Sequence, residues 1–408
     1  MIRGYDVICC APDPWHSIWR NRQQIMSILA EGNRILFVEP RQYLRPSLAA
    51  FRRREVGCKD LFRPLVEPVR PGLWRFQYPV YAPISGRPPL RGWMAWLQVW
   101  ALRRALRRLG FVSPLLWLYR PDDRDLVGKL GERMVIYHVV DEYSAYEEGY
   151  EDRVAPGKRQ AIREREQRLL EQADLVFTVS RPLWEAKRQF NPNTHLVPNG
   201  VNFSAFAEAV GKPLPADLAA LPPPRLGYAG NLNEKIDLLL LRRLAETWPD
   251  GSLVLVGPVS LRFDLDLLER LRLPNIHFLG QKEVADLPRY VAGFDVCLMP
   301  YKRNEWTRHI SPLKLYEYLA CGKPIVSTAI PAAQEFAALL YVAEEPGEFT
   351  GLVEQALAEE GTALAQARRQ EASKHTWHAR VEQMSALIEA TLRSMPRSPG
   401  ASASRRTP

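Results

Sequence analysis

The residues best suited to chemistry lie in SPLKLYEYLACGKPIVST, positions 311–328. Ser311 is a good N-cap for a helix that Gly322 would end. Lys314 and Glu317 are three residues apart, so a helix places both on one face. The N–H groups at a helix start attract a diphosphate, and a carboxylate one turn later can accept both ribose hydroxyls. The stretch therefore predicts a nucleoside-diphosphate site, although a surface helix with an ion pair has the same pattern.

Two series of short apolar runs, separated by helical patterns, must position these residues. Runs without polar alternation indicate buried parallel strands. In the first half they cover 5–10, 34–40, 114–119, 134–140, 174–180 and 194–198, and in the second half 225–230, 252–257, 275–280, 295–300, 323–328 and 339–343. Helical patterns cover 158–172, 236–247, 286–293 and 312–321. This is a doubly wound α/β pattern that occurs twice.

The boundary between the two series is a proline-rich stretch at 203–224. We therefore expect a first Rossmann-like domain at 1–202, a linker at 203–224 and a second Rossmann-like domain at 225–374. A final helical stretch at 375–394 has no strand after it and would return to the first domain. The Ser-, Pro- and Arg-rich residues 395–408 are typical of a disordered tail.

Composition narrows the functional class. The chain has 408 residues, a net charge of +9 and 46% hydrophobic residues, which is typical of a globular protein of two or three domains. No apolar run is long enough for a transmembrane helix or a secretory signal. The five cysteines form no metal-ligand spacing, so we expect reduced thiols in a cytoplasmic protein. No nucleic-acid signature accompanies the arginines, and nucleic acid is not an expected partner.

The segment 91–109, RGWMAWLQVWALRRALRRL, combines tryptophans at helical spacing with a strongly cationic end. Two interpretations remain open. A helix that lies at an anionic membrane surface has this pattern, and would make the protein peripheral at the cytoplasmic face. A helix that packs on the core, with solvated arginines, has it too.

The stretch 311–328 resembles the donor-site signature of GT-B glycosyltransferases, in the large retaining family of bacterial cell-surface polysaccharide enzymes (group 1, family 4-like). Further resembling segments follow in the family's order: VPNGVN at 197–202, RLGYAGNLNEK at 225–235, LVLVGP at 253–258 and FDVCLMPY at 294–301. The resemblance implies two Rossmann-like domains that face each other across a cleft. It also implies sugar transfer, with retention, from a UDP- or GDP-sugar to a glycan or lipid-linked glycan acceptor.

Residue roles follow from the resemblance. Glu317 would bind the donor ribose, and the diphosphate would lie against Ser311, Leu313 and Lys314. The family's clamp after the first strand of the second domain corresponds to Gly230, Asn231 and Lys235. Asn231 stands where the family usually has an arginine, and Arg308 could supply that charge. His309 stands where the family often has the first of two glutamates that are separated by seven residues, Glu317 being the second.

The acceptor is expected on the first domain. His138, Asp141 and Glu142 follow a strand whose carboxyl end would face the donor, and they could orient the acceptor or take its proton. A core histidine and a helix cap are the alternative interpretation. The loop at 13–24 offers His16 and Arg20, and we expect Arg22 to face solvent.

No metal or other cofactor is expected. Asp264 and Asp266 form a DxD pattern, but helix capping explains it better. Helix dipole and basic side chains would neutralise the leaving diphosphate instead. Two other functions remain open: a nucleotide-sugar 2-epimerase with the same fold, and a non-catalytic glycan-binding subunit.

Overall fold

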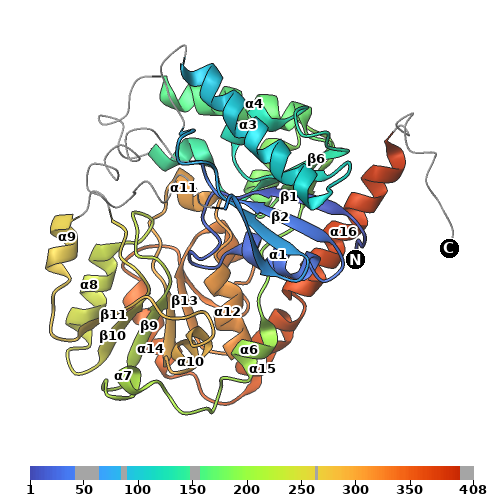
Figure 1. Ribbon diagram of the computed structural model, residues 1–408. Helices are drawn as coiled ribbons and strands as arrows, with labels where there is room; N and C mark the ends of the chain where they lie inside the picture. The colour runs from blue at the N-terminus through green and yellow to red at the C-terminus, as the bar shows by residue number, and fades with distance from the viewer. Residues whose placement is uncertain (42–63, 84–89, 148–156, 262–264, 396–408) are drawn as a thin grey trace.

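The computed structural model describes residues 1–41, 64–83, 90–147, 157–261 and 265–395. It has two domains, each a sheet with helices on both faces (Figure 1). Predicted features at 42–63, 84–89, 148–156, 262–264 and 396–408, among them Cys58, Asp264 and almost all of the predicted tail, lie outside the described residues.

The first domain is built on an 8-stranded sheet in the order β3-β4-β2-β1-β5-β6-β7-β8. The strands are β1 (Asp6–Cys10), β2 (Arg34–Val38), β3 (Val66–Arg70), β4 (Leu73–Phe76), β5 (Leu115–Leu118), β6 (Met134–Val139), β7 (Leu175–Thr178) and β8 (Thr194–Leu196). All neighbours pair in parallel except β3 and β4, which form an antiparallel hairpin.

Successive side chains of the first sheet point to opposite faces and build two separate core layers. Val7 and Cys9 belong to the layer covered by α1 (Asn21–Leu29) and by α16 (Trp377–Ser394). Ile8 and Cys10 belong to the layer covered by α3 (Leu90–Leu109), α4 (Lys158–Gln172) and α5 (Arg181–Lys187). The short 3-10 helices η2 (Pro121–Leu126) and η3 (Tyr143–Glu147) follow β5 and β6.

The second domain is built on a parallel 6-stranded sheet in the order β11-β10-β9-β12-β13-β14. The strands are β9 (Arg225–Ala229), β10 (Ser252–Val256), β11 (Ile276–Gly280), β12 (Val296–Met299), β13 (Ile325–Thr328) and β14 (Tyr341–Ala343). The helices are α8 (Leu238–Thr247), α9 (Leu265–Arg270), α10 (Leu287–Ala292), α11 (Glu305–Arg308), α12 (Leu313–Cys321), α13 (Pro331–Gln334), α14 (Phe349–Leu357) and α15 (Ala363–Ser373).

The two domains are joined twice. The stretch expected as a linker contains two short helices, α6 (Phe203–Ala207) and α7 (Ala216–Ala219), whose Phe206 and Leu218 pack into the second core. At the other connection α16 crosses back and lies along α1 of the first domain (Figure 1). Its Trp377, 5% exposed, is part of the first domain's core.

The doubly wound α/β prediction is confirmed, and each of the twelve predicted strands is present. The hairpin of β3 and β4 was not predicted, because Pro68 and the half-exposed side chains of β3 hide its pattern. Helix α12 ends at Gly322 in the left-handed conformation, as predicted. Its N-cap is Pro312 rather than the expected Ser311. No helix in the described part of the chain is long and apolar enough to span a bilayer.

Candidate active site at the domain interface

The candidate site lies where the strand order of the second sheet reverses, between β9 and β12. Ligands of doubly wound sheets bind beyond the carboxyl ends of the strands at such a point. Tyr228 and Gly230 come from the end of β9, and Tyr301 follows β12. Helix α12 brings Lys314 against these residues from its first turn.

Lys314 is enclosed by tyrosines. Its Nζ donates hydrogen bonds to Tyr301 Oη at 2.9 Å and to Tyr228 Oη at 3.2 Å. The ammonium also lies 4.4 Å from the centre of the Tyr228 ring. Burial lowers the pKa of Lys314 to about 7, although Glu317 opposes the shift. The site thus holds an amine that gains a proton readily when an anion arrives.

Glu317 is the acidic counterpart on the same helix. Burial raises the pKa of its carboxyl to about 7, and the neighbouring Lys314 limits the rise. An amine and a carboxyl that both titrate near neutrality are unusual for a structural ion pair and typical of a functional site. Together they offer a positive charge for phosphate and an acceptor for hydroxyl groups.

Two glycines keep the loop after β9 close to Lys314. Gly230 has a φ of +143°, and a Cβ there would lie 2.9 Å from Lys314 Nζ. Gly257 has a φ of +135°, and a Cβ there would lie 2.1 Å from the carbonyl oxygen of Gly230. Both positions therefore require glycine, and the backbone can approach a ligand closely.

The first domain reaches the same site through Asp141. Trp306 Nε1 donates a hydrogen bond to Asp141 Oδ1 at 3.1 Å, and Lys235 Nζ lies 3.9 Å from Asp141 Oδ2. Lys235 also lies 4.7 Å from the centre of the Trp306 ring. Arg20 adds positive charge here, since it contributes to the lowered pKa of both Lys235 and Lys314, after burial as the main cause. Direct contacts thus bring Asp141, Trp306 and Lys235 together, while Arg20 acts on the two lysines electrostatically and lies 3.9 Å from Asp13 Oδ2.

The other donor-side residues differ in their placement. Asn231 Oδ1 accepts a hydrogen bond from Ser260 Oγ at 2.6 Å. Leu313 packs against the core of the first domain, and the carbonyl of Ser311 accepts a hydrogen bond from Asn199 Nδ2 at 2.7 Å. Arg308 is 65% exposed and lies 3.7 Å from Glu305 on its own helix. Among the described contacts, none joins Arg308 to Lys314 or Lys235.

His309 and Glu142 lie in a neighbouring pocket of about 370 Å³ between the domains. His309 is 6% exposed, and its Nδ1 lies 2.8 Å from the carbonyl oxygen of Glu305. Glu142 pairs with Lys187 Nζ at 2.7 Å, and Lys187 also binds Glu166 at 2.9 Å. Although burial opposes it, this pairing lowers the pKa of Glu142. The carboxylate of Glu142 is therefore engaged in an ion pair in the described structure.

His138 is buried, 1% exposed, among the rings of Trp117, Tyr119 and Phe177. Neither ring nitrogen has a hydrogen-bond partner among the described residues. Burial, with a smaller effect of Arg22, lowers the pKa of His138 to about 3, so the imidazole is neutral. His16 is exposed. Arg22 is 3% exposed and paired with Asp13, so the expectation that it faces solvent is wrong.

Tyr228, Tyr301 and Trp306 were missed by the sequence analysis. Their common signal is position: Tyr228 lies near the end of β9, Tyr301 follows β12, and Trp306 lies in α11 between β12 and α12. Aromatic side chains at strand ends are usually read as core. Only the folded contacts show that the tyrosines hold Lys314 and that Trp306 faces Lys235.

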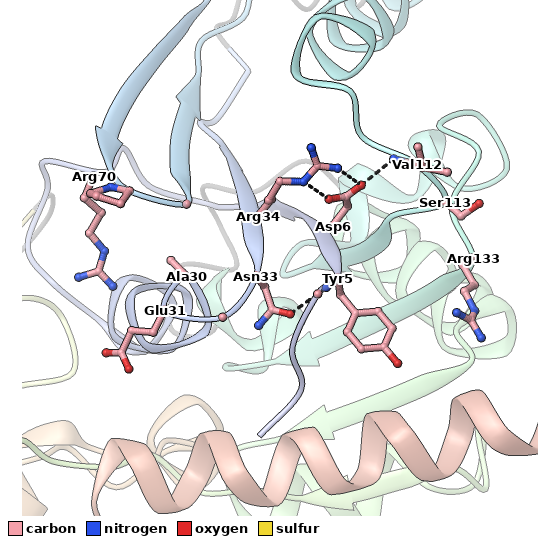
Figure 2. Close-up of a pocket in the computed structure, with 14 residues that line it drawn as sticks. Tyr5, Asp6, Ala30, Glu31, Asn33, Arg34, Arg70, Val112, Ser113 and Arg133 are labelled. Carbon is pink, nitrogen blue, oxygen red and sulfur yellow. Dashed lines mark hydrogen bonds and ion pairs between the residues drawn. The ribbon is translucent and has the colours of Figure 1, made fainter. Parts of the chain in front are cut away.

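A recess of about 1000 Å³ lies at the opposite edge of the first sheet, where the strands begin. Figure 2 shows its centre, in which Arg34 holds Asp6 through two nitrogens at 2.6 and 2.7 Å. Asp6 also accepts the backbone N–H of Val112. These polar groups join neighbouring loops to one another, and the candidate site is at the other end of the strands. No cluster of three or more potential metal ligands occurs among the described residues.

The two domains, with a site at their interface, define the GT-B architecture, and solved structures agree. The chain is similar to a sucrose-phosphate synthase from Thermosynechococcus elongatus, with a TM-score of 0.70, 17% identity and coverage of 96% of this chain and 100% of that one. It is also similar to Anabaena HepE in complex with UDP, with a TM-score of 0.64, 14% identity and coverage of 95% and 100%. At such identities the likeness establishes the fold.

Sequence comparison identifies the second domain. Residues 223–359 match the family described as glycosyl transferases group 1. TuaH of Bacillus subtilis (strain 168), which is provisionally named a teichuronic acid biosynthesis glycosyltransferase, is 29% identical over 259 residues. That match covers 61% of this chain and 65% of TuaH, less than two thirds of that relative. The chain thus has the GT-B fold, and the segment of its second domain that matches this family contains Gly230, Lys235, Lys314 and Glu317.

Proposed function

We propose that the protein transfers a hexosyl unit from a nucleotide-diphosphate sugar to a glycan or lipid-linked glycan, with retention, in cell-surface polysaccharide synthesis. The observation that carries the proposal is the Lys314–Glu317 pair at the reversal point of the second sheet, in a segment that matches the group 1 family, with Lys314 held by Tyr228 and Tyr301. The pair combines an amine suited to a diphosphate with a carboxylate suited to a ribose.

The proposed roles follow the contacts. Lys314, Lys235 and the N–H groups at the start of α12 would stabilise the charge that develops on the leaving diphosphate. Arg20 acts electrostatically on both Lys235 and Lys314, and would supply from the first domain the cation that Asn231 does not provide. We propose that these groups act without a metal or other cofactor.

Asp141 is the proposed contact between donor and acceptor sides. In the described structure its carboxylate accepts from Trp306 and faces Lys235. A diphosphate that binds Lys235 would release part of this pairing. The carboxylate would then be available to orient an acceptor hydroxyl, while the leaving diphosphate takes the proton. The side chain of His138 is only 1% exposed and would act only after local rearrangement.

Two similarities support the choice of substrates. HepE has been solved in complex with UDP-glucose, which favours a uridine nucleotide over guanosine as the donor. The provisional name of TuaH supports a cell-envelope polysaccharide as the product class. We propose action at the cytoplasmic face of the membrane, where such donors are made available.

The experiment that tests the function has two stages. A thermal-shift screen against UDP, GDP, ADP, TDP and their sugars should show stabilisation by one nucleotide family, because a ligand that binds only the folded state raises its stability. The selected sugar is then incubated with glycan acceptors, and products are analysed by mass spectrometry. A glycosylated acceptor plus released nucleotide is expected. A sugar epimer without transfer would indicate the 2-epimerase, and binding without turnover would indicate the glycan-binding subunit.

A further inference from the structure

The outward face of α3 carries an unusual set of exposed side chains. The protein has eleven tryptophans, and the three that are exposed all lie on this helix: Trp93 at 57%, Trp96 at 59% and Trp100 at 40%. Their spacing of three and four residues places them in one stripe. The opposite face, with Ala101, Leu102, Ala105 and Leu106, packs into the first domain's core. The buried face therefore anchors the helix to the domain, and the three exposed tryptophans are not needed for that contact.

Positive charge continues the stripe. Arg103, Arg104, Arg107 and Arg108 are exposed, and α3 contains no acidic residue. Arg104 lies 5.7 Å from the Trp100 ring centre, and Arg103 donates to the carbonyl oxygen of Lys129. Glu132 is the acidic residue nearest to Lys129 in the sequence. Its carboxylate accepts hydrogen bonds from backbone N–H groups of its own loop. A groove of about 340 Å³ beside α3 is lined by residues of both kinds, Trp96, Trp100, Arg103 and Arg107, together with Phe111 and Leu130 among others.

The helix is oriented so that its tryptophan end lies toward the candidate site. Arg34, at the start of β2, donates to the carbonyl oxygen of Leu109, so the arginine end of α3 lies at the edge where strands begin. Gln98 donates to the carbonyl oxygen of Ala82, which follows β4, so the other half lies toward the carboxyl edge. That edge is the one at which Asp141 meets the second domain.

We propose that the outward face of α3 docks the protein on an anionic phospholipid bilayer, with its three tryptophans in the interfacial layer and its arginines against lipid phosphates. Indole rings favour this layer because it accommodates both an apolar ring and an N–H donor. Arginines held at the same depth add an attraction that depends on anionic lipid. The charge selects a bilayer over a second copy of this chain, because two copies would bring like-charged arginines together. This docking goes beyond sugar transfer and does not require it.

The test uses the full chain and vesicles of phosphatidylcholine alone or mixed with phosphatidylglycerol. The wild-type protein should co-sediment with the anionic vesicles at low salt, show a blue shift of tryptophan fluorescence, and dissociate at high salt. The variant W93S/W96S/W100S should bind at least about tenfold more weakly. The variant R104E/R107E/R108E should lose the preference for phosphatidylglycerol. All six positions are exposed, so both variants should fold.

Matched controls change similar side chains on the second domain and on the 203–224 segment that packs against it. The variant L239S/F278S/V284S removes exposed apolar groups, and K212E/R243E/R270E reverses exposed charges. Neither should alter vesicle binding. Absence of wild-type binding to anionic vesicles, or equal binding by the tryptophan variant, would overturn the proposal. A wild-type dimer in light scattering that W93S/W96S/W100S converts to a monomer would instead assign the face to self-association. Nucleotide binding, measured in parallel, is expected to be unchanged in all variants and separates this proposal from the proposed function.

Discussion

At the residue scale, the sequence located Lys314 and Glu317 but not what surrounds them. Their spacing on a helix is a local property, which a sequence displays directly. The tyrosines that enclose Lys314 come from two other strands, and contacts between distant segments leave no mark in the spacing. Arg22 shows the converse, since a charged residue in a polar loop is normally exposed, yet Asp13 pairs with it in a buried position.

Donor affinity should depend on pH in both directions. Burial brings the pKa of Lys314 down to about 7 and that of Glu317 up to about 7. Below neutrality Glu317 becomes protonated and loses its charge, and above it Lys314 becomes neutral. Affinity should therefore peak near pH 7 and fall about tenfold toward about pH 5.5 and about pH 8.5.

Calorimetry with the nucleotide sugar measures this profile, because its diphosphate has no terminal phosphate that titrates in the range. In the Glu317→Gln variant, donor affinity should no longer fall below neutral pH but should still fall above it. A flat profile in the wild-type protein would contradict the assigned protonation states.

The missing clamp arginine gives a second prediction at this scale. Arg20 influences both site lysines, whereas Arg308 contacts Glu305. Arg20→Ala should weaken binding of the nucleoside diphosphate about tenfold, which is typical of a lost charged contact to phosphate. Arg308→Ala should change it less than about twofold, within the range of exposed charges. The two dissociation constants, compared at one ionic strength, would rule against Arg20 if the order were reversed.

At the element scale, the apolar runs predicted the strands well, and the reason is physical. A parallel strand buried on both faces needs an unbroken apolar run, and such runs stand out in the sequence. The hairpin of β3 and β4 lies at the sheet edge, where one face stays half-exposed, and it was missed. Helix starts were predicted less accurately than strands. The expected N-cap of α12 was Ser311, whereas the helix begins after Pro312.

The loop after β10 packs closely against the loop after β9, where Gly257 meets the backbone of Gly230. Gly257→Ala would push a Cβ to 2.1 Å from the carbonyl oxygen of Gly230, at a φ of +135°. We expect a loss of about 2–4 kcal/mol in the free energy of unfolding of the second domain, from steric overlap and backbone strain. Urea denaturation measures it. Gly347→Ala, where nothing lies within 4 Å of the added Cβ, is the control. Equal stability of the two variants would refute the close approach.

At the scale of the whole molecule, the two domains are tied by side chains that one domain lends to the other. Trp377 begins α16 just after α15 of the second domain and is buried in the first domain's core. Ser180 Oγ donates to the carbonyl oxygen of His309 across the interface at 2.7 Å. The sequence predicted a final helix at 375–394, and the resemblance to GT-B enzymes implied that it returns to the first domain. It could not show which residues meet at the interface.

Trp377→Ala should therefore destabilise the first domain although the residue directly follows the second. Removal of a buried indole costs about 3–5 kcal/mol. Hydrogen exchange should show reduced protection of β1 and β2 and unchanged protection of β9 and β12. The exposed Gln383→Ala change on the same helix serves as the control. Loss of protection in β9 and β12 alone would mean that α16 supports the other domain.

The donor site is tested by calorimetric titration of the nucleoside diphosphate chosen by the thermal screen into wild-type protein, Glu317→Ala and Glu354→Ala. Glu354 is exposed on α14 of the same domain and is the matched control. We predict one site per chain in the wild-type protein and in Glu354→Ala, and affinity at least about tenfold weaker in Glu317→Ala, because a hydrogen-bonded carboxylate is lost. Unchanged affinity in Glu317→Ala would contradict the donor site, and with it the proposed transfer reaction.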